Sequence, residues 1–238
     1  MKVDILAFAA HPDDIELACS GTILKEIEAG KKVAIVDLTE GELGSRGTIQ
    51  TRYEEAKQSA TILGLSAREN LNLGDGTFEN TSDNRLKIIE SIRKYRPTIV
   101  LANALKDRHP DHGRAAKLVA DACFYSGLLK IETFLGSTAQ EKWRPSLLLH
   151  YIQDQYLEPD FVVDVTKYWT KRMDCVLAFK TQFYNPKSDE PETPISSSDF
   201  LDFLNARGRS FGRPIGAKYA EGFMKSRTLG VNSLTDII

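Results

Sequence analysis

The chain has 238 residues, of which 42% are hydrophobic and 27% charged, and its formal net charge is −2. This composition is typical of a globular protein with enough apolar residues to bury one core. The small net charge gives no electrostatic reason to expect nucleic acid or an anionic membrane as a partner. No apolar run approaches the roughly 18 residues that a membrane span requires.

Strands and helices are predicted to alternate up to about residue 125. The predicted strands cover residues 3–9, 32–38, 70–73 and 98–103. The predicted helices cover residues 17–29, a segment that begins at 51, and residues 82–95 and 113–125. Such alternation predicts right-handed βαβ units and a mostly parallel, doubly wound sheet with helices on both faces.

After residue 125 the pattern is weaker. Two more strands are predicted at 146–152 and 161–165, two helices at 166–179 and 199–211, and a polar loop at 185–198. We therefore predict a single α/β domain over residues 1–238, with a core to about residue 165 and a small helical elaboration over about 166–238.

The start of the chain and its cysteines bear on where the protein works. Asp4 lies inside the first apolar run, so this run is unlike a secretory signal. Cys19, Cys123 and Cys175 are odd in number and far apart, which indicates neither a disulfide framework nor a zinc finger. We expect a cytoplasmic protein.

Three of the four histidines lie in two short acidic clusters, Ala-His-Pro-Asp-Asp at 10–14 and His-Pro-Asp-His at 109–112. Each cluster directly follows an apolar run that is predicted to be a buried strand. In an open α/β sheet, ligands bind in the crevice beyond the carboxyl ends of the strands. Isolated turn residues could give one such cluster by chance, but two at strand exits favour a metal site.

A hydrolytic zinc centre has three protein ligands and one open position for water. His11, Asp14 and His112 can supply two imidazoles and one carboxylate. Bound zinc lowers the pKa of water from about 15.7 to about 7. Asp13 is adjacent to Asp14 in the chain, and is therefore the candidate general base for that water.

His109 and Asp111 remain for a second catalytic task. We expect Asp111 to orient a protonated His109 near the metal. That imidazolium would stabilise an oxyanion or protonate a leaving amine.

At these residues the chain resembles a known family. Residues 10–16, followed by 109–112, resemble the PIG-L/LmbE-like zinc-dependent N-acetylglucosaminyl deacetylases, and the loop at 39–52 is similar to theirs. Residues 216–223 look like the bacillithiol-pathway branch, which deacetylates N-acetylglucosaminyl-malate. The resemblance implies a Rossmann-like sheet without a nucleotide, and the first strand is indeed not followed by Gly-x-Gly-x-x-Gly.

The resemblance also implies site roles. The metal ligands are His11, Asp14 and His112, the base is Asp13, and His109 with Asp111 forms an electrophilic pair. It further implies a homo-oligomer, with hexamers among the family members, and a small sugar conjugate as substrate. The native metal is left open between zinc and ferrous iron.

Three further residues are predicted to bind substrate. Arg46 and Arg52 flank the loop after the second strand, where guanidinium groups could pair with malate carboxylates. Surface charge is the alternative reading of each. Tyr184 is a candidate pocket residue, with core packing as its alternative.

The leading hypothesis is thus deacetylation of N-acetylglucosaminyl-malate in bacillithiol biosynthesis. The alternatives are a deacetylase of another N-acetylglucosaminide, a metallophosphoesterase and a metal-stabilised sugar-binding module. A phosphoesterase with two metals would need more ligands than these clusters offer. A binding module would have no use for the free carboxylate of Asp13.

Overall fold

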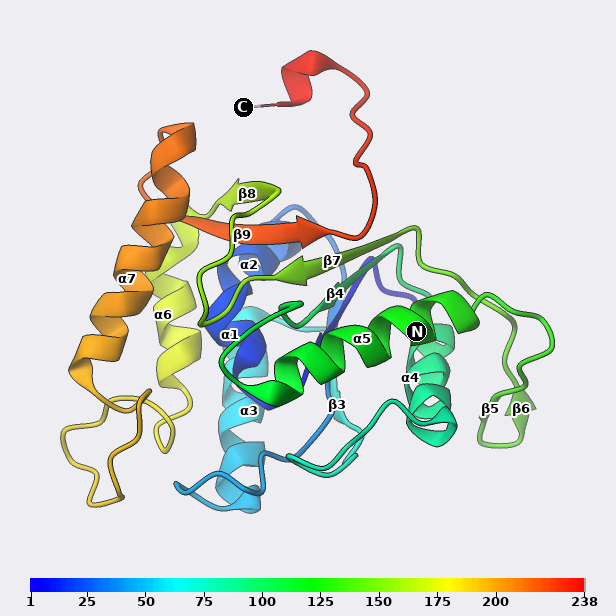
Figure 1. Cartoon of the computed structure of the whole chain (residues 1–238), viewed down its shortest axis with the longest axis horizontal. Helices are drawn as coiled ribbons and strands as arrows, with labels where there is room; N and C mark the ends of the chain where they lie inside the picture. Colours follow the sequence, from blue (N-terminus) through cyan, green and yellow to red (C-terminus); the bar gives the residue numbers. More distant parts are fainter. Residues whose placement is uncertain (238) are drawn as a thin grey trace.

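A computed structural model describes residues 1–237 of the chain (Figure 1). The central sheet has seven strands in the order β3-β2-β1-β4-β7-β9-β8, and β5 pairs with β6 in a separate hairpin. The strands are β1 (Ile5–Ala9), β2 (Val33–Asp37), β3 (Ala67–Asn70), β4 (Ile99–Ala102), β5 (Phe134–Leu135), β6 (Thr138–Ala139), β7 (Leu147–Tyr151), β8 (Phe161–Asp164) and β9 (Ala220–Lys225). The α-helices are α1 (Asp14–Ala18), α2 (Ser20–Glu28), α3 (Ile49–Leu63), α4 (Ser82–Tyr95), α5 (Pro110–Tyr125), α6 (Trp169–Leu177) and α7 (Ser198–Gly212).

The first five strands of the sheet order, β3-β2-β1-β4-β7, are parallel. Their order reverses between β1 and β4, because β1 leads outward to β2 and β3 while β4 starts the other half. Such a reversal opens a crevice at the carboxyl ends of the two strands. The predicted doubly wound α/β fold is confirmed.

Alternate residues of β1 enter two separate cores, as the period of two along a strand requires. Leu6 and Phe8 pack with residues of α4 and α5 on one face. Ile5, Ala7 and Ala9 pack with residues of α2, α3 and α6 on the other. Figure 1 shows α4 and α5 on the side of the sheet opposite to α2, α3 and α6.

The C-terminal part differs from the prediction, because it is not only helical. β9 inserts into the central sheet between β7 and β8 and pairs antiparallel with both. The expected boundary near residue 165 therefore falls between strands of one sheet. Local patterning hid β9, whose buried residues include Gly222 and the charged Glu221.

Two helix boundaries differ where the functional clusters lie. The helix expected over 17–29 is two helices that meet at Cys19, and the first begins as early as Asp14. The second cluster forms the first turn of α5, which was expected to begin near Gly113. Proline is well tolerated there, since the first helical residue needs no hydrogen-bonded N–H.

Within residues 1–237, no helix combines the length and apolarity that crossing a membrane requires. Cys19, Cys123 and Cys175 are all free and buried.

Candidate metal centre and active site

The first cluster forms a tight turn between β1 and α1. Asp13 is the residue before α1, and its φ of 127° is a conformation that residues other than glycine rarely adopt. The turn is closed by the Asp14 carboxylate, whose Oδ2 accepts a hydrogen bond from the backbone N–H of His11 at 2.9 Å. Backbone strain of this kind persists only where the surroundings fix it, and it is concentrated at functional sites.

The second cluster lies at the end of the loop that follows β4, where α5 begins. His109 caps the helix, because its Nδ1 accepts a hydrogen bond from the backbone N–H of Asp111 at 3.3 Å. An accepting Nδ1 carries no proton, so in this geometry the His109 ring is neutral, not protonated as expected, and its proton lies on Nε2.

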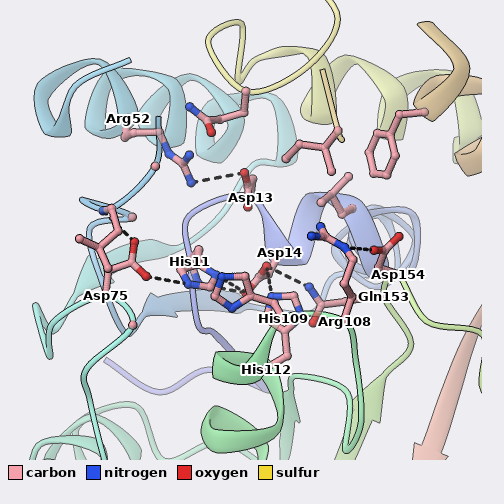
Figure 2. A pocket seen from close by; sticks show the side chains of 18 of the residues that line it. His11, Asp13, Asp14, Arg52, Asp75, Arg108, His109, His112, Gln153 and Asp154 are labelled. Carbon is pink, nitrogen blue, oxygen red and sulfur yellow. Dashed lines mark hydrogen bonds and ion pairs between the residues drawn. The ribbon is translucent and has the colours of Figure 1, made fainter. Parts of the chain in front are cut away.

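The two clusters meet at the switch point between β1 and β4. The Asp14 carboxylate lies between two imidazoles, 3.8 Å from His11 Nδ1 and 3.2 Å from His112 Nε2. All three side chains are buried, and Figure 2 shows them converging on one side of the pocket. The structure therefore brings together the three residues that the sequence predicted as metal ligands.

The remaining nitrogen of each imidazole contacts a carboxylate. His112 Nδ1 lies 2.7 Å from Asp107 Oδ2, and His11 Nε2 lies 3.1 Å from Asp75 Oδ1 and 3.3 Å from Asp111 Oδ2. Metal-binding histidines usually donate this second N–H to a carboxylate, which fixes the tautomer and raises ligand basicity. The nitrogens that face Asp14 are therefore the ones left for a metal ion, and the donor set fits one.

Two groups of donor atoms other than the predicted set have the mutual spacing of a metal site. The donor atoms of His11, His109 and His112 all lie within 4.8 Å of one another, as do those of His11, Asp75 and Asp111. The first group shares two residues with the predicted ligand set. Imidazole and carboxylate donors suit zinc as well as iron, so they do not distinguish these metals.

The charges of Asp14 and the two neighbouring histidines shift one another's pKa values. Burial by itself lowers the pKa of His112, but Asp14 and Asp107 raise it to about 9. Burial by itself would raise the pKa of Asp14, but His112 and His11 hold it well below its usual range. A cation is thus favoured between these groups, and a metal ion would replace the imidazole protons on binding.

Asp13 has the environment of a general base. Burial raises the pKa of its carboxyl to about 7, although the Arg52 guanidinium opposes this rise. A base with a pKa near the working pH combines availability with driving force for proton transfer. The side chain lines the same cavity as His11, Asp14 and His112.

Arg52 contacts the protein rather than standing free for a substrate. Its Nη2 donates to the carbonyl oxygen of Pro12 at 2.6 Å and to Asp13 Oδ2 at 3.3 Å. Gly41 packs against the guanidinium, since a Cβ there would lie 3.0 Å from Nη2. The structure therefore gives Arg52 a role in holding the strained turn and Asp13. Arg52 also lines the cavity, and its pairing with an aglycone carboxylate stays a prediction.

The expected pairing of Asp111 with His109 is also corrected. The Asp111 carboxylate accepts a hydrogen bond from the backbone N–H of Gly76 at 2.9 Å, and Arg114 Nη1 lies 3.0 Å from it. It also contacts His11, as described above. Among the bonds of residues 1–237, the one that joins Asp111 to the His109 ring comes from the backbone N–H of Asp111. His109 is therefore oriented by the helix cap, and Asp111 contacts the predicted ligand His11 instead.

Arg46 and Tyr184 lie outside the cavity wall. Arg46 donates to the carbonyl oxygens of Thr181 at 2.5 Å and Pro191 at 2.8 Å, and to Ser188 Oγ at 3.0 Å. All three of its guanidinium nitrogens are engaged, so it holds the 181–191 segment instead of a substrate. Tyr184 is 41% exposed and is not among the cavity residues. Neither residue is retained as a substrate ligand.

Several site residues escaped the sequence analysis. Asn103 Nδ2 donates to Asp14 Oδ2 at 2.8 Å, and Gln153 Nε2 donates to Asp14 Oδ1 at 2.9 Å. Asn103 directly follows β4, Gln153 comes shortly after β7, and Asp75 lies in the turn that follows β3. Their shared signal is a polar side chain just beyond a parallel strand, where side chains of neighbouring strands converge.

The site opens into a cavity of about 250 Å³. Its walls come from the turns after β1, β2, β3, β4 and β7, and from the segment between α6 and α7 together with α7 itself. Carboxylates and imidazoles crowd one end, while Leu17, Ile195 and Phe200 supply apolar surface. A pocket with convergent polar groups and perturbed pKa values is characteristic of an active site.

A profile described as PIG-L, GlcNAc-PI de-N-acetylase, matches residues 6–123, the part that carries both clusters. The conserved protein TT1542 of Thermus thermophilus has a crystal structure that superposes with a TM-score of 0.84 at 33% identity, over 97% of this chain and 98% of that one. This chain belongs to the PIG-L family. As a PIG-L protein it is a deacetylase, a hydrolase of amide bonds.

Other proteins are similar to this chain over most of its length. Diacetylchitobiose deacetylase of Thermococcus kodakarensis is 28% identical over 92% of this chain and 81% of its own. A probable N-acetyl-alpha-D-glucosaminyl L-malate deacetylase 2 of Bacillus anthracis is 25% identical over 75% and 81%. 4-Oxalmesaconate hydratase of Pseudomonas putida is 27% identical over 70% and 69%. N,N'-diacetylchitobiose deacetylase of Pyrococcus horikoshii has the same fold, with a TM-score of 0.79 at 24% identity over 99% of this chain and 88% of that one.

Proposed function

We propose that this protein removes the N-acetyl group from the N-acetylglucosamine unit of a small sugar conjugate, with one divalent metal ion held by His11, Asp14 and His112. The observation that supports this most is the convergence of those three side chains beside the buried carboxylate of Asp13. We propose zinc as the native ion, with ferrous iron as the alternative. A homo-oligomer remains the expected assembly.

When bound, such an ion acts as a Lewis acid that makes water more acidic and polarises the acetamide carbonyl. Asp13 takes a proton from the attacking water as the carbon–oxygen bond forms. The Nε2–H of neutral His109 donates a hydrogen bond to the developing oxyanion. Asp13 then returns the proton to the amine nitrogen as the carbon–nitrogen bond breaks, so that the products are acetate and a free amine.

For the rest of the substrate we propose L-malate, as in N-acetylglucosaminyl L-malate, which would place the enzyme in bacillithiol biosynthesis. The similarity of residues 216–223 to that branch and the Bacillus anthracis relative support this choice. The relatives named for diacetylchitobiose make a second N-acetylglucosamine unit the alternative.

The test is an assay on the purified protein with its metal content measured on the same sample. Release of acetate and amine is followed with N-acetylglucosaminyl L-malate and with diacetylchitobiose. The same samples are assayed for phosphate release from phosphate esters and for hydration of an unsaturated dicarboxylate, since one relative is a hydratase. Equal amounts of acetate and amine would support the proposal. Hydration without acetate release would contradict it.

A further inference from the structure

Three arginines line the cavity, and two of them already have a carboxylate partner. Arg52 pairs with Asp13 at 3.3 Å, and Arg108 pairs with Asp154 at 2.5 Å. The third, Arg207 of α7, has no carboxylate oxygen within 4.0 Å among residues 1–237. In the same part of the chain, its one hydrogen-bond acceptor is the carbonyl oxygen of Leu17, at 2.5 Å.

No carboxylate of residues 1–237 contacts Arg207, although Asp154, Glu221 and Asp107 attract its charge from farther away. Arg172 donates to the same Leu17 carbonyl at 2.6 Å and also pairs with Glu221 at 3.2 Å. Glu221 further accepts hydrogen bonds from the backbone N–H groups of Gly21 and Thr22 at the start of α2. Arg172 and Arg207 therefore share the Leu17 carbonyl, and Glu221 pairs with Arg172 rather than with Arg207.

The pKa of Arg207 is consistent with these contacts. Burial, together with the charge of Arg172, lowers the pKa of Arg207 to about 9. The side chain is still protonated at neutral pH. A partly buried cation without an anionic partner is costly, and an anion that enters the cavity would remove that cost.

The position of Arg207 suits the end of the substrate remote from the acetyl group. Leu17 follows Asp14 by three residues on α1, so its carbonyl lies about one helical turn from the metal ligand. The metal end of the cavity is dominated by the carboxylates of Asp13, Asp14 and Asp75. An acidic substituent would be repelled there and attracted at Arg207.

We propose that Arg207 binds a carboxylate of the substrate's aglycone and so selects acidic conjugates over neutral ones. This proposal rests on the proposed function and names the residue that would recognise the acidic half of the substrate. The guanidinium is held by the Leu17 carbonyl and packs near Phe203, with its centre 5.5 Å from the ring centroid. It is thus fixed in place with N–H groups left for a carboxylate.

The test compares two substrates that differ only in charge, N-acetylglucosaminyl L-malate and its dimethyl ester. Wild-type enzyme should favour the diacid over the diester by at least tenfold in kcat/KM. Arg207→Gln should remove this preference by raising KM for the diacid about ten- to hundredfold, the effect of losing a charge-assisted hydrogen bond. KM for the diester should stay the same, and Arg207→Lys should keep part of the preference.

Arg209→Gln is the matched control, because Arg209 lies on the same helix but is exposed. It should leave both substrates unaffected. Equal losses on both substrates with Arg207→Gln would show that Arg207 only supports α1, and would overturn the proposal. Equal kcat/KM values of the wild-type enzyme for the diacid and the diester would also overturn the proposal.

Failure of the proposed function is distinguishable from failure of this inference. If no acetate is released from either compound, the deacetylase proposal fails. Binding measured by calorimetry in an Asp13→Asn background, where turnover is blocked, still tests Arg207. There the diacid should bind more tightly than the diester, and the added Arg207→Gln change should abolish that difference. Equal affinities before that change would contradict the inference.

Discussion

Arg52 Nη2 lies 3.3 Å from Asp13 Oδ2 and donates to the carbonyl oxygen of the preceding Pro12 at 2.6 Å. One guanidinium therefore holds both the candidate base and the turn whose φ at Asp13 is 127°. It also lowers the pKa of a carboxyl that burial raises. We therefore expect substitutions of Arg52 to affect proton transfer by Asp13.

Replacing Arg52 should shift the pH dependence of the reaction. The base must be deprotonated to act, and the positive charge of Arg52 favours the deprotonated form of Asp13. Arg52→Gln should raise the pKa of Asp13 and move the acidic limb of the kcat/KM profile upward by about one to three pH units. The profile of Arg52→Lys should lie much closer to that of wild type. If the acidic limb of the profile does not shift in Arg52→Gln, Arg52 does not control the pKa of the base.

Asp13→Asn should leave the metal bound but abolish most activity. The amide has nearly the same shape and tolerates the unusual backbone conformation, yet it cannot take a proton. Loss of a general base costs about 10²–10⁴-fold in turnover. Metal analysis and turnover measured on the same preparation provide the check, and near-normal turnover would mean that water is activated without Asp13.

Asp107→Asn should weaken metal binding although Asp107 is not a proposed ligand. Its Oδ2 lies 2.7 Å from His112 Nδ1 and fixes the ring so that Nε2 faces Asp14. Removing such a carboxylate typically costs about 10- to 100-fold in metal affinity. Asp154→Asn is the control, because Asp154 also lines the cavity but pairs with Arg108. Equal affinities for the Asp107 variant and wild type, from competition with a chelator, would contradict the assignment.

Arg46→Ala should loosen the 181–191 segment without changing metal content. The variant loses hydrogen bonds to Thr181, Ser188 and Pro191. Amide hydrogen exchange in that segment should become faster, since exchange reports local opening. Lys187→Ala, at an exposed position of the same segment, should have no such effect. If amide hydrogen exchange is unchanged in the Arg46 variant, Arg46 does not hold the 181–191 segment.

The sheet and both clusters were predictable because their signals are local. Apolar runs indicate buried strands, and the polar clusters come directly after β1 and at the end of the loop that follows β4. The core of the doubly wound sheet follows from this alternation alone. The three histidines and three aspartates of the two clusters therefore came together as the strand order requires.

The partners of the arginines were not predictable, because they depend on contacts distant in sequence. Arg46 bonds to residues more than 130 positions away, and Arg207 bonds to Leu17 across 190 positions. β9 was missed because Glu221 is buried by its bonds to α2 and Arg172, which breaks the apolar pattern of a strand. Asp75 and Asp107 lie in loops, where only the fold shows that they contact histidines.

The most direct test of the central claim is metal removal and replacement in wild type and in His112→Ala, with acetate release from N-acetylglucosaminyl L-malate as the readout. Wild type should lose activity on chelation, regain it with one equivalent of zinc or ferrous iron, and bind one ion per chain. His112→Ala should bind the ion far more weakly and stay inactive at that stoichiometry. Acetate release that survives complete metal removal, or a His112→Ala variant with full occupancy and activity, would contradict the account.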